Sequence, residues 1–146
     1  FATDLTTVPT DGRDLARIIA QALGRAGLTP QDVDLAALHG TATRDGDANE
    51  AVAMQLVFGS RASQVACLAT KWLHGHLLGA ASAVETVLAI RALVTRRVPP
   101  VSGNQCDGNM LGDDRGRPQE VKCGRVAVKL SAGFGGQVSV CVLRSG

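Results

Sequence analysis

Residues 71–85 hold three side chains whose types and spacing could do chemistry. Lys71, His76 and Glu85 lie in this stretch, and an apolar run that predicts a helix begins beside His76. Near a helix start, the positive end of the helix dipole disfavours the imidazolium form of histidine. A neutral imidazole can donate one hydrogen bond and is a useful catalytic group, whereas a lone buried histidine is more often a hydrogen-bonded core residue.

Glu85 needs a partner if the helix that carries it is buried. The apolar residues from Leu77 to Val94 cover nearly every face of the expected helix, a pattern typical of a helix buried on all sides. A carboxylate in such a helix is costly unless it is paired, and Lys71 is the nearest upstream cation. We therefore predict a Lys71–Glu85 ion pair. Glu85 and Arg91 also interrupt the apolar run, which disfavours a membrane-spanning segment.

The remaining elements follow from periodicity and turn residues. Strand–helix alternation followed by two strands predicts an α/β layer with a mixed sheet. Helices are expected from a cap at Thr10 or Asp11 to Gly24 or Gly27 and from Asp47 to Phe58, with a short helical turn at Thr29–Pro30. Strands are expected at 33–38, 65–69, 121–130 and 137–143, with Val98-Pro99-Pro100 ending the long helix, an irregular loop at 102–120 and a tight glycine-rich connection at 131–136.

Composition narrows the class of protein. A length of 146 residues and a hydrophobic content of 45% allow one domain with a real core and exclude disorder. A net charge of +2 and 3% aromatic residues give neither a basic face nor stacking aromatics, so nucleic acid is not an expected partner. The cysteines lack metal-like spacing, so we expect no metal site, reduced thiols and a cytoplasmic location. They are Cys67, Cys106, Cys123 and Cys141.

Three segments are expected to meet at one edge of the sheet. His39 follows the first predicted strand, Lys71 and His76 follow the second, and Phe134 lies in the glycine-rich connection between the last two. Sites in α/β proteins are built at strand ends, so these four residues form the predicted site.

Three motifs, in this order, carry a family resemblance. They are HGTAT at 39–43 followed by Gly46-Asp47 and Glu50, Lys71 with GHLLGAAS at 75–82 and Glu85, and GFGG at 133–136. The sequence resembles, over almost its whole length, the C-terminal half of the β-ketoacyl synthases, the condensing enzymes of fatty acid and polyketide synthesis. The resemblance implies a thiolase-like α/β fold in which residues 1–146 form one domain, the C-terminal half of an αβαβα architecture.

The resemblance also implies a role for each histidine and its neighbours. His39 and His76 look like the two active-site histidines, which hold the malonyl thioester carbonyl and stabilise the enolate formed as carbon dioxide leaves. Lys71 looks like the family lysine, which supports the histidine site and pairs with the residue matching Glu85. A purely structural ion pair is the alternative for Lys71.

Other site residues carry alternatives as well. Thr41 and Thr43 match threonines that contact the phosphopantetheine arm, but they could be turn or cap residues. Phe134 matches the gating phenylalanine, whose backbone N–H helps form the oxyanion hole for the acyl-cysteine thioester, but it could be a packed core aromatic. Asp47 and Glu50 are expected to be first-turn helix residues rather than acids in the chemistry.

The sequence departs from the family pattern at a few positions. Ala132, Val138 and Ser82 replace an aromatic residue, an asparagine and a glycine. None of the four cysteines stands where a catalytic thiolate is expected, at a helix N-terminus or beside a cation. The half that carries the family's nucleophilic cysteine lies outside this sequence.

Two classes of function remain. The first is the C-terminal half of a β-ketoacyl-[acyl-carrier-protein] synthase, which catalyses decarboxylative Claisen condensation when joined to its N-terminal half. The second is a non-catalytic partner of the chain-length-factor kind. Retention of both histidines and Lys71 favours the enzyme, and Phe134 in place of a terminal-loop cysteine disfavours a thiolase.

The implied partners follow from the same resemblance. They are the N-terminal half, an acyl carrier protein whose phosphopantetheine carries the substrates, and a second copy of the chain, with no cofactor of the chain's own. A single α/β layer can cover only one side of the long helix. We therefore expect the isolated chain to expose an apolar face and to self-associate.

Overall fold

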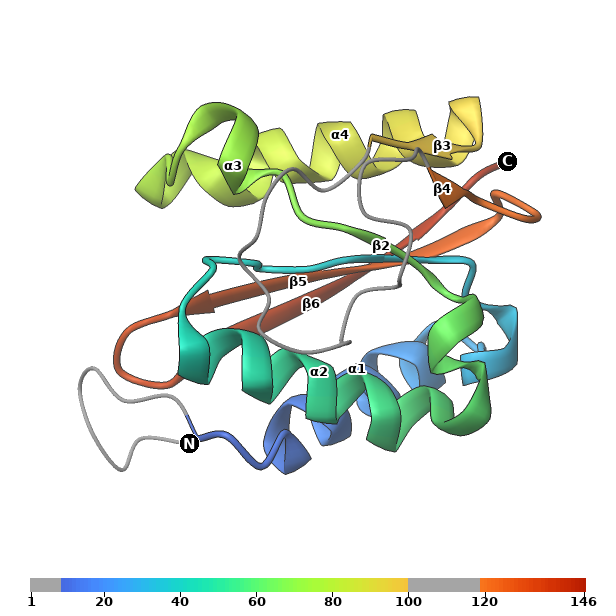
Figure 1. Ribbon diagram of the computed structural model, residues 1–146. Helices are drawn as coiled ribbons and strands as arrows, with labels where there is room; N and C mark the ends of the chain where they lie inside the picture. The colour runs from blue at the N-terminus through green and yellow to red at the C-terminus, as the bar shows by residue number, and fades with distance from the viewer. Residues whose placement is uncertain (1–8, 100–118) are drawn as a thin grey trace.

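The computed structural model describes residues 9–99 and 119–146, which form three layers (Figure 1). A four-stranded sheet lies in the middle, with helices α1 and α2 on one face and α3 and α4 on the other. The helices are α1 Arg13–Arg25, α2 Arg44–Phe58, α3 Lys71–His74 and α4 Ala81–Thr95, with short 3-10 turns η1 Pro30–Asp32, η2 Gly59–Gln64 and η3 Leu78–Ala80. The strands are β1 Leu35–Ala37, β2 Ala66–Leu68, β3 Arg97–Val98, β4 Gln119–Glu120, β5 Val126–Gly133 and β6 Gln137–Arg144.

The sheet is mixed, as predicted. Its strand order is β2-β1-β5-β6, with β1 parallel to both β2 and β5, and β5 antiparallel to β6. Because β1, β2 and β5 run the same way, their carboxyl ends lie at one edge of the sheet. Strands β3 and β4 form a separate antiparallel pair. The expectations for residues 1–8, for most of the 102–120 loop and for Cys106 lie outside the described residues.

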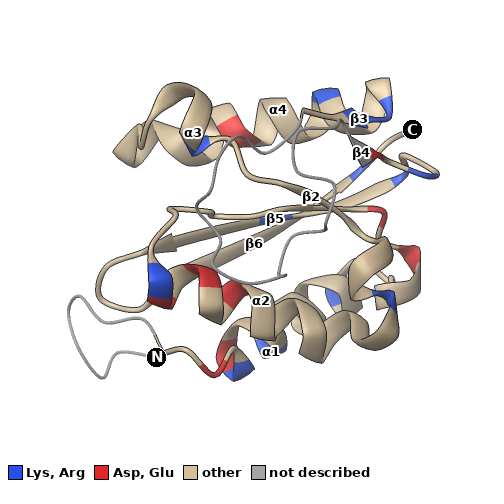
Figure 2. Cartoon of the chain, viewed as in Figure 1, with Lys and Arg blue, Asp and Glu red and all other residues tan. Residues whose placement is uncertain are grey.

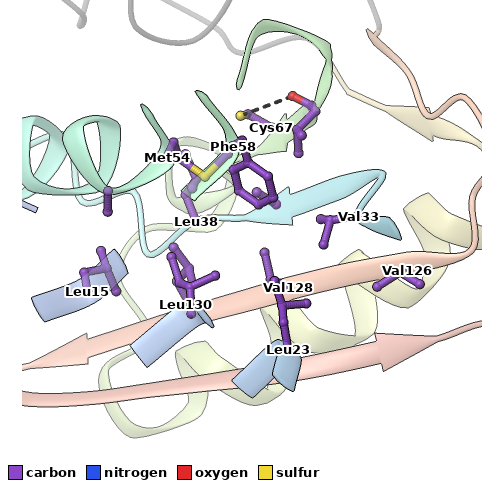
Figure 3. Close-up of a cluster of buried hydrophobic side chains, with 14 residues drawn as sticks. Leu15, Leu23, Val33, Leu38, Met54, Phe58, Cys67, Val126, Val128 and Leu130 are labelled. Atoms are coloured by element: carbon purple, nitrogen blue, oxygen red, sulfur yellow. Dashed lines mark hydrogen bonds between the residues drawn. The ribbon is translucent and has the colours of Figure 1, made fainter. Parts of the chain in front are cut away.

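One hydrophobic core lies between the sheet and the layer of α1 and α2 (Figure 3). Helix α1 buries Leu15, Ile19 and Leu23, which recur at helical spacing, and the predicted amphipathic helix is confirmed. The predicted cap at Thr10 or Asp11 is wrong, because Gly12 takes this position with a φ of 65°. A Cβ at Gly12 would meet the backbone nitrogen of Ala53 at 2.4 Å, so only glycine allows α1 to start this close to α2.

In the first half of the chain, the predicted start of the second helix is corrected and the predicted turn at Thr29–Pro30 is confirmed. Helix α2 begins at Arg44, three residues before the predicted start at Asp47, and it buries Asn49 and Glu50 besides its apolar residues. The short turn at Thr29–Pro30 is confirmed. Asp32 accepts hydrogen bonds from the Thr29 backbone N–H and hydroxyl at 2.8 and 2.7 Å, which caps the turn.

The long helix expected from His76 to Val94 is interrupted. Helix α3 ends at His74 with Gly75 as its C-cap, Leu78 has a φ of 50°, and α4 begins only at Ala81. His76 is therefore five residues before α4, and the argument that places it at the N-terminus of that helix is wrong. The break has a local signal, because Gly75 and Gly79 are weak helix formers and Gly75 takes a φ of 74° at the end of α3.

Helix α4 is not buried all round in this chain, contrary to the periodicity argument. It buries Ala81, Glu85, Ala89, Ala92 and Leu93 in a second core against the sheet. Its other face stays exposed. By length and composition alone, the segment Leu78–Thr95 could cross a membrane, a test that core helices of soluble proteins also pass. The expectation of no membrane partner remains a prediction.

The last two strands differ from the prediction at both ends. Strand β5 begins at Val126 rather than at residue 121 and continues through Ser131 and Ala132 to Gly133, so the connection is shorter than expected. Phe134, Gly135 and Gly136 make the turn, and the two glycines have φ values of 74° and 72°. The predicted glycine-only angles of this connection are confirmed.

Candidate active site

Four elements bring the predicted residues to the same edge of the sheet. His39 follows β1, Lys71 begins α3 just after β2, and Glu85 comes from α4, which packs against β1 and β5. His76 lies in the connection between α3 and η3. The charged residues of α3, α4 and β5 are coloured in Figure 2. Strands β1 and β2 pair in parallel, so the segments that follow them, which carry His39 and Lys71, meet at the same edge of the sheet as expected.

The two histidines are direct neighbours. Their ring centroids are 5.6 Å apart and the rings are nearly perpendicular, at 79°. Lys71 Nζ lies 3.4 Å from His39 Nδ1 and also donates a hydrogen bond to the His39 carbonyl oxygen. The lysine therefore contacts both the ring and the backbone of the first histidine.

The hydrogen bonds assign the same tautomer to both rings. An ammonium can only donate, so His39 Nδ1 accepts from Lys71. His76 Nδ1 accepts from the backbone N–H of Leu78 at 3.0 Å. In the neutral imidazole the proton is then on Nε2 of each ring. The site therefore holds two Nε2–H donors next to each other.

His39 is held in its neutral form. Burial first, and then the positive charge of Lys71, lower the pKa of His39 from 6.5 to about 4, while the negative charge of Glu85 acts in the opposite direction. The ring is half-buried and His76 is exposed. At neutral pH, His39 is a hydrogen-bond donor rather than a cation.

The predicted Lys71–Glu85 ion pair is confirmed, and a second lysine joins it. Lys129 of β5 lies 2.8 Å from Oε2 of Glu85, while Lys71 contacts Oε1. All three side chains are buried. Burial alone would raise the pKa of Glu85, but its contacts with Lys129 and Lys71 hold that pKa below its usual value. Lys129 is not among the predicted site residues, although a lysine inside an apolar strand is a visible signal in the sequence.

Glu50 is another residue whose place differs from the prediction. It is buried and lies beyond the first turn of α2, which holds Asp45 and Asp47, and its carboxylate accepts hydrogen bonds from the backbone N–H groups of His39 and Gly40 at 2.6 and 2.8 Å. Burial raises the pKa of Glu50 to about 7 against these two hydrogen bonds. Glu50 therefore fixes the backbone of the loop that carries His39. Asp47 does lie in the first turn of α2, as expected.

The threonines and Phe134 surround the site without contacting the histidine rings in any interaction that the structure records for residues 9–99 and 119–146. The hydroxyls of Thr41 and Thr43 lie 3.0 Å apart, and Thr43 is the N-cap of α2 without a side-chain cap bond. Phe134 lies in the β5–β6 turn with 77% of its surface exposed, so the alternative of a packed core aromatic is wrong for this chain. Its role as a gate remains a prediction.

The cysteines of the described part offer no activated thiol. Cys67 is buried in β2, and burial raises the pKa of its thiol to about 12. Cys123 and Cys141 are exposed, in the segment before β5 and in β6, and neither is at a helix N-terminus. Within residues 9–99 and 119–146, no group of three or more His, Cys, Asp or Glu side chains could hold a metal ion.

Comparisons with known proteins agree with this arrangement. The family described as "Beta-ketoacyl synthase, C-terminal domain" matches residues 2–104. A mitochondrial 3-oxoacyl-[acyl-carrier-protein] synthase of Arabidopsis thaliana is 36% identical over 137 residues, which is 90% of this chain and 30% of the relative. Nodulation protein E of Rhizobium leguminosarum bv. trifolii is 34% identical over 137 residues, which is 90% of this chain and 33% of the relative. The chain thus spans about a third of the length of these relatives.

Solved structures give the same answer for the fold. A chain from a type II polyketide ketosynthase bound to its acyl-carrier protein superposes with a TM-score of 0.85 at 31% identity, over 99% of this chain and 36% of the other. A chain from a ketosynthase in complex with its chain length factor, from Xenorhabdus doucetiae, has a TM-score of 0.83 at 27% identity, over 99% of this chain and 36% of the other. The predicted thiolase-like α/β fold is confirmed.

Proposed function

Because this chain belongs to the β-ketoacyl synthase family as a C-terminal domain of it, we propose that it supplies the decarboxylation site of a condensing enzyme. The reaction is the decarboxylative Claisen condensation of an acyl thioester with a malonyl thioester carried by an acyl carrier protein. One observation carries the proposal: His39 and His76 are neighbours, 5.6 Å apart between ring centroids, and each has Nε2 as its donor nitrogen.

The two donors suit one step of this reaction. The carbonyl oxygen of the malonyl thioester accepts a hydrogen bond from each Nε2–H. As carbon dioxide leaves, negative charge moves onto that oxygen, and two fixed donors stabilise the enolate. A neutral His39 performs this role without giving up a proton, and burial together with Lys71 keeps it neutral. Lys71 and Glu85 position the ring and do not contact the substrate.

The covalent half of the cycle requires residues from elsewhere. Cys67 is a poor nucleophile because its thiol stays protonated at neutral pH. We expect the acyl group to be carried by a cysteine of the N-terminal half. The substrates are expected to arrive on phosphopantetheine, with Thr41 and Thr43 beside the arm and Phe134 at the entrance of the acyl pocket. No separate cofactor is needed, and we expect a cytoplasmic homo-oligomer.

Decarboxylation can be measured by itself. In the chain joined to its nucleophile-bearing half, His39→Ala and His76→Ala should each slow carbon dioxide release from malonyl carrier protein by roughly 10²–10³-fold, the scale for losing one oxyanion donor. His74→Ala is the matched control, because the ring of His74 hydrogen-bonds to Thr70 and Gly75 and, among residues 9–99 and 119–146, to neither His39 nor His76. The control should retain most of the rate. An unchanged rate in either test variant removes that histidine from the mechanism.

A chain-length-factor-like partner is the second candidate. Its support is that one structural neighbour comes from a complex of a ketosynthase with its chain length factor. The retained His39, His76 and Lys71 favour the enzyme, because a non-catalytic partner has no use for two neighbouring histidine donors. If neither histidine variant alters decarboxylation in the assembled protein, the partner role is the better explanation.

A further inference from the structure

Lys129 is a buried lysine in the middle of strand β5. Its side chain is only 1% exposed, in a strand whose other central residues are apolar. Side chains alternate along a strand, and Ala127 belongs to the core under α4 whereas Val128 and Leu130 belong to the opposite core. Lys129 therefore faces α4. Lysine is almost never fully buried unless it is paired, so its partners explain its presence.

The ammonium of Lys129 is fully surrounded by acceptors. It lies 2.8 Å from Oε2 of Glu85 and 2.8 Å from the Ser131 hydroxyl, and it donates to the carbonyl oxygen of Leu130. The ammonium thus makes two hydrogen bonds, to Leu130 and Ser131, and one ion pair, with Glu85. The Ser131 hydroxyl also lies 2.6 Å from that of Ser82 on α4. Lys129 thus ties α4 to the strand that leads into the Phe134 turn.

The charge count shows that Lys129 is not needed to neutralise Glu85. The Lys71–Glu85 pair is neutral by itself, and Lys129 adds a second buried cation to a single carboxylate. An apolar side chain at position 129 would avoid this desolvation cost. A lysine here has a geometric effect, because each oxygen of Glu85 contacts its own cation, and the second contact disfavours rotation of the carboxylate away from Lys71.

We propose that Lys129 is a positioning residue for the histidine pair: by holding Oε2 of Glu85, it fixes the Lys71 ammonium against the ring and carbonyl of His39. The inference deepens the proposed function and rests on it. Lys129 does not contact the substrate, and its effect reaches His39 through Glu85 and Lys71. The decarboxylation geometry therefore depends on strand β5 as well as on the two histidine loops.

Electrostatics point in the same direction as the geometry. The positive charge of Lys129 lowers the pKa of His39, in addition to the larger effects of burial and of Lys71. The charged and titratable groups that act on or contact His39 are Lys71 of α3, Glu85 of α4, Lys129 of β5, His76 of the following loop and Glu50 of α2. Removal of Lys129 should therefore raise the pKa of His39, both by losing a charge and by loosening Lys71.

The test is Lys129→Met in the chain joined to its nucleophile-bearing half. Methionine keeps the length of the side chain and removes the ammonium. We expect decarboxylation of malonyl carrier protein to fall by about 10- to 100-fold, the scale for small misplacement of a catalytic group, with KM little changed. Histidine-labelled protein followed by NMR should show the His39 pKa rising from about 4. Lys122→Met is the matched control, because Lys122 is exposed in the segment before β5. It should alter neither the decarboxylation rate nor the His39 pKa.

A second set of variants separates positioning from general stability. Because Lys129 acts through Glu85, adding Lys129→Met to Glu85→Gln should cause no further loss of rate. Ser131→Ala, which removes one acceptor of Lys129 without changing charge, should shift the His39 pKa in the same direction by less, and it serves if Lys129→Met does not fold. A folded Lys129→Met protein with unchanged rate and unchanged His39 pKa overturns the inference, as do additive losses in the double variant. If the unmutated assembled protein has no decarboxylase activity and Lys129→Met still shifts the His39 pKa, the positioning role is supported and the proposed function is refuted.

Discussion

Replacing Val87, Ile90 and Val94 together by serine should separate this chain from the layer that we expect to cover α4. The three residues recur at i, i+3 and i+7, so they form one stripe on the helix face opposite the sheet. Their exposed fractions are 65%, 47% and 73%. Other exposed apolar side chains of the same helical layer are Trp72, Leu73, Leu77 and Leu78. Unpartnered apolar surface of this kind marks an interface.

The magnitude follows from the exposed fractions. Together the three side chains expose the equivalent of about two complete aliphatic side chains, and each is worth about 1.5–3 kcal/mol when buried. Covering the stripe should therefore contribute about 3–6 kcal/mol. Serine at all three positions removes most of this gain. The dissociation constant for the covering partner should rise by about 10²–10⁴-fold.

The assay compares this chain with and without its partner. Light scattering should show that the isolated wild-type chain self-associates and that the triple serine variant does not. Titration calorimetry against a separately produced nucleophile-bearing half should show the weaker binding directly. Leu56→Ser is the matched control, because Leu56 is 56% exposed on α2, in the opposite layer. A wild-type chain that stays monomeric at high concentration, or a serine variant that binds as well as the wild type, would refute the packing argument.

Other consequences of the site can be tested in the same protein. Glu85→Gln should destabilise folding by about 3–5 kcal/mol in urea denaturation, because two buried ammonium groups lose their counter-charge; an unchanged midpoint would contradict the buried network. Iodoacetamide at pH 8 should leave Cys67 unmodified in the native state, since its thiol pKa is about 12, and mass spectrometry of an alkylated Cys67 would count against this. The pKa of His39 is depressed from 6.5 to about 4, so the contribution of neutral His39 to folding stability is complete above pH 6.5 and is lost as pH falls through 4. His39→Gln should remove this part of the acid dependence of the unfolding midpoint. Identical acid profiles for the variant and the wild type would argue against a depressed pKa. Phe134→Ala should change acyl selectivity in loading assays while the melting temperature stays constant, because the ring is 77% exposed; the opposite pattern would indicate a packing role.

Much of the local structure is predictable from the sequence because it depends on local patterns. The 3.6-residue spacing of Leu15, Ile19 and Leu23 predicts α1, and the short apolar runs predict β1 and β2. Element boundaries are less predictable. Gly12 is the N-cap of α1 because α2 approaches closely, and β5 begins only at Val126. Hydrophobic periodicity gives no signal for either boundary.

The candidate site divides in the same way. The motifs are sufficient to select His39, Lys71 and His76, and the rule that a buried carboxylate needs a cation is sufficient to pair Glu85 with Lys71. One cation is enough to satisfy this rule for Glu85, so the rule predicts no second partner. It neither requires nor locates Lys129, which reaches Glu85 only because β5 lies beside β1 and under α4.

The sequence by itself determined which segments are helix or strand and which residue types could stabilise an oxyanion. Tertiary structure alone decided two things: the contact of the Glu50 carboxylate with the His39 backbone, and the second lysine on Glu85. The physical reason is that side-chain periodicity specifies the face of an element but not what lies opposite that face. Strand order and helix position bring residues far apart in the chain within a few ångströms, and the hydrogen bonds and charges that assign both histidines their donor nitrogen come from those contacts.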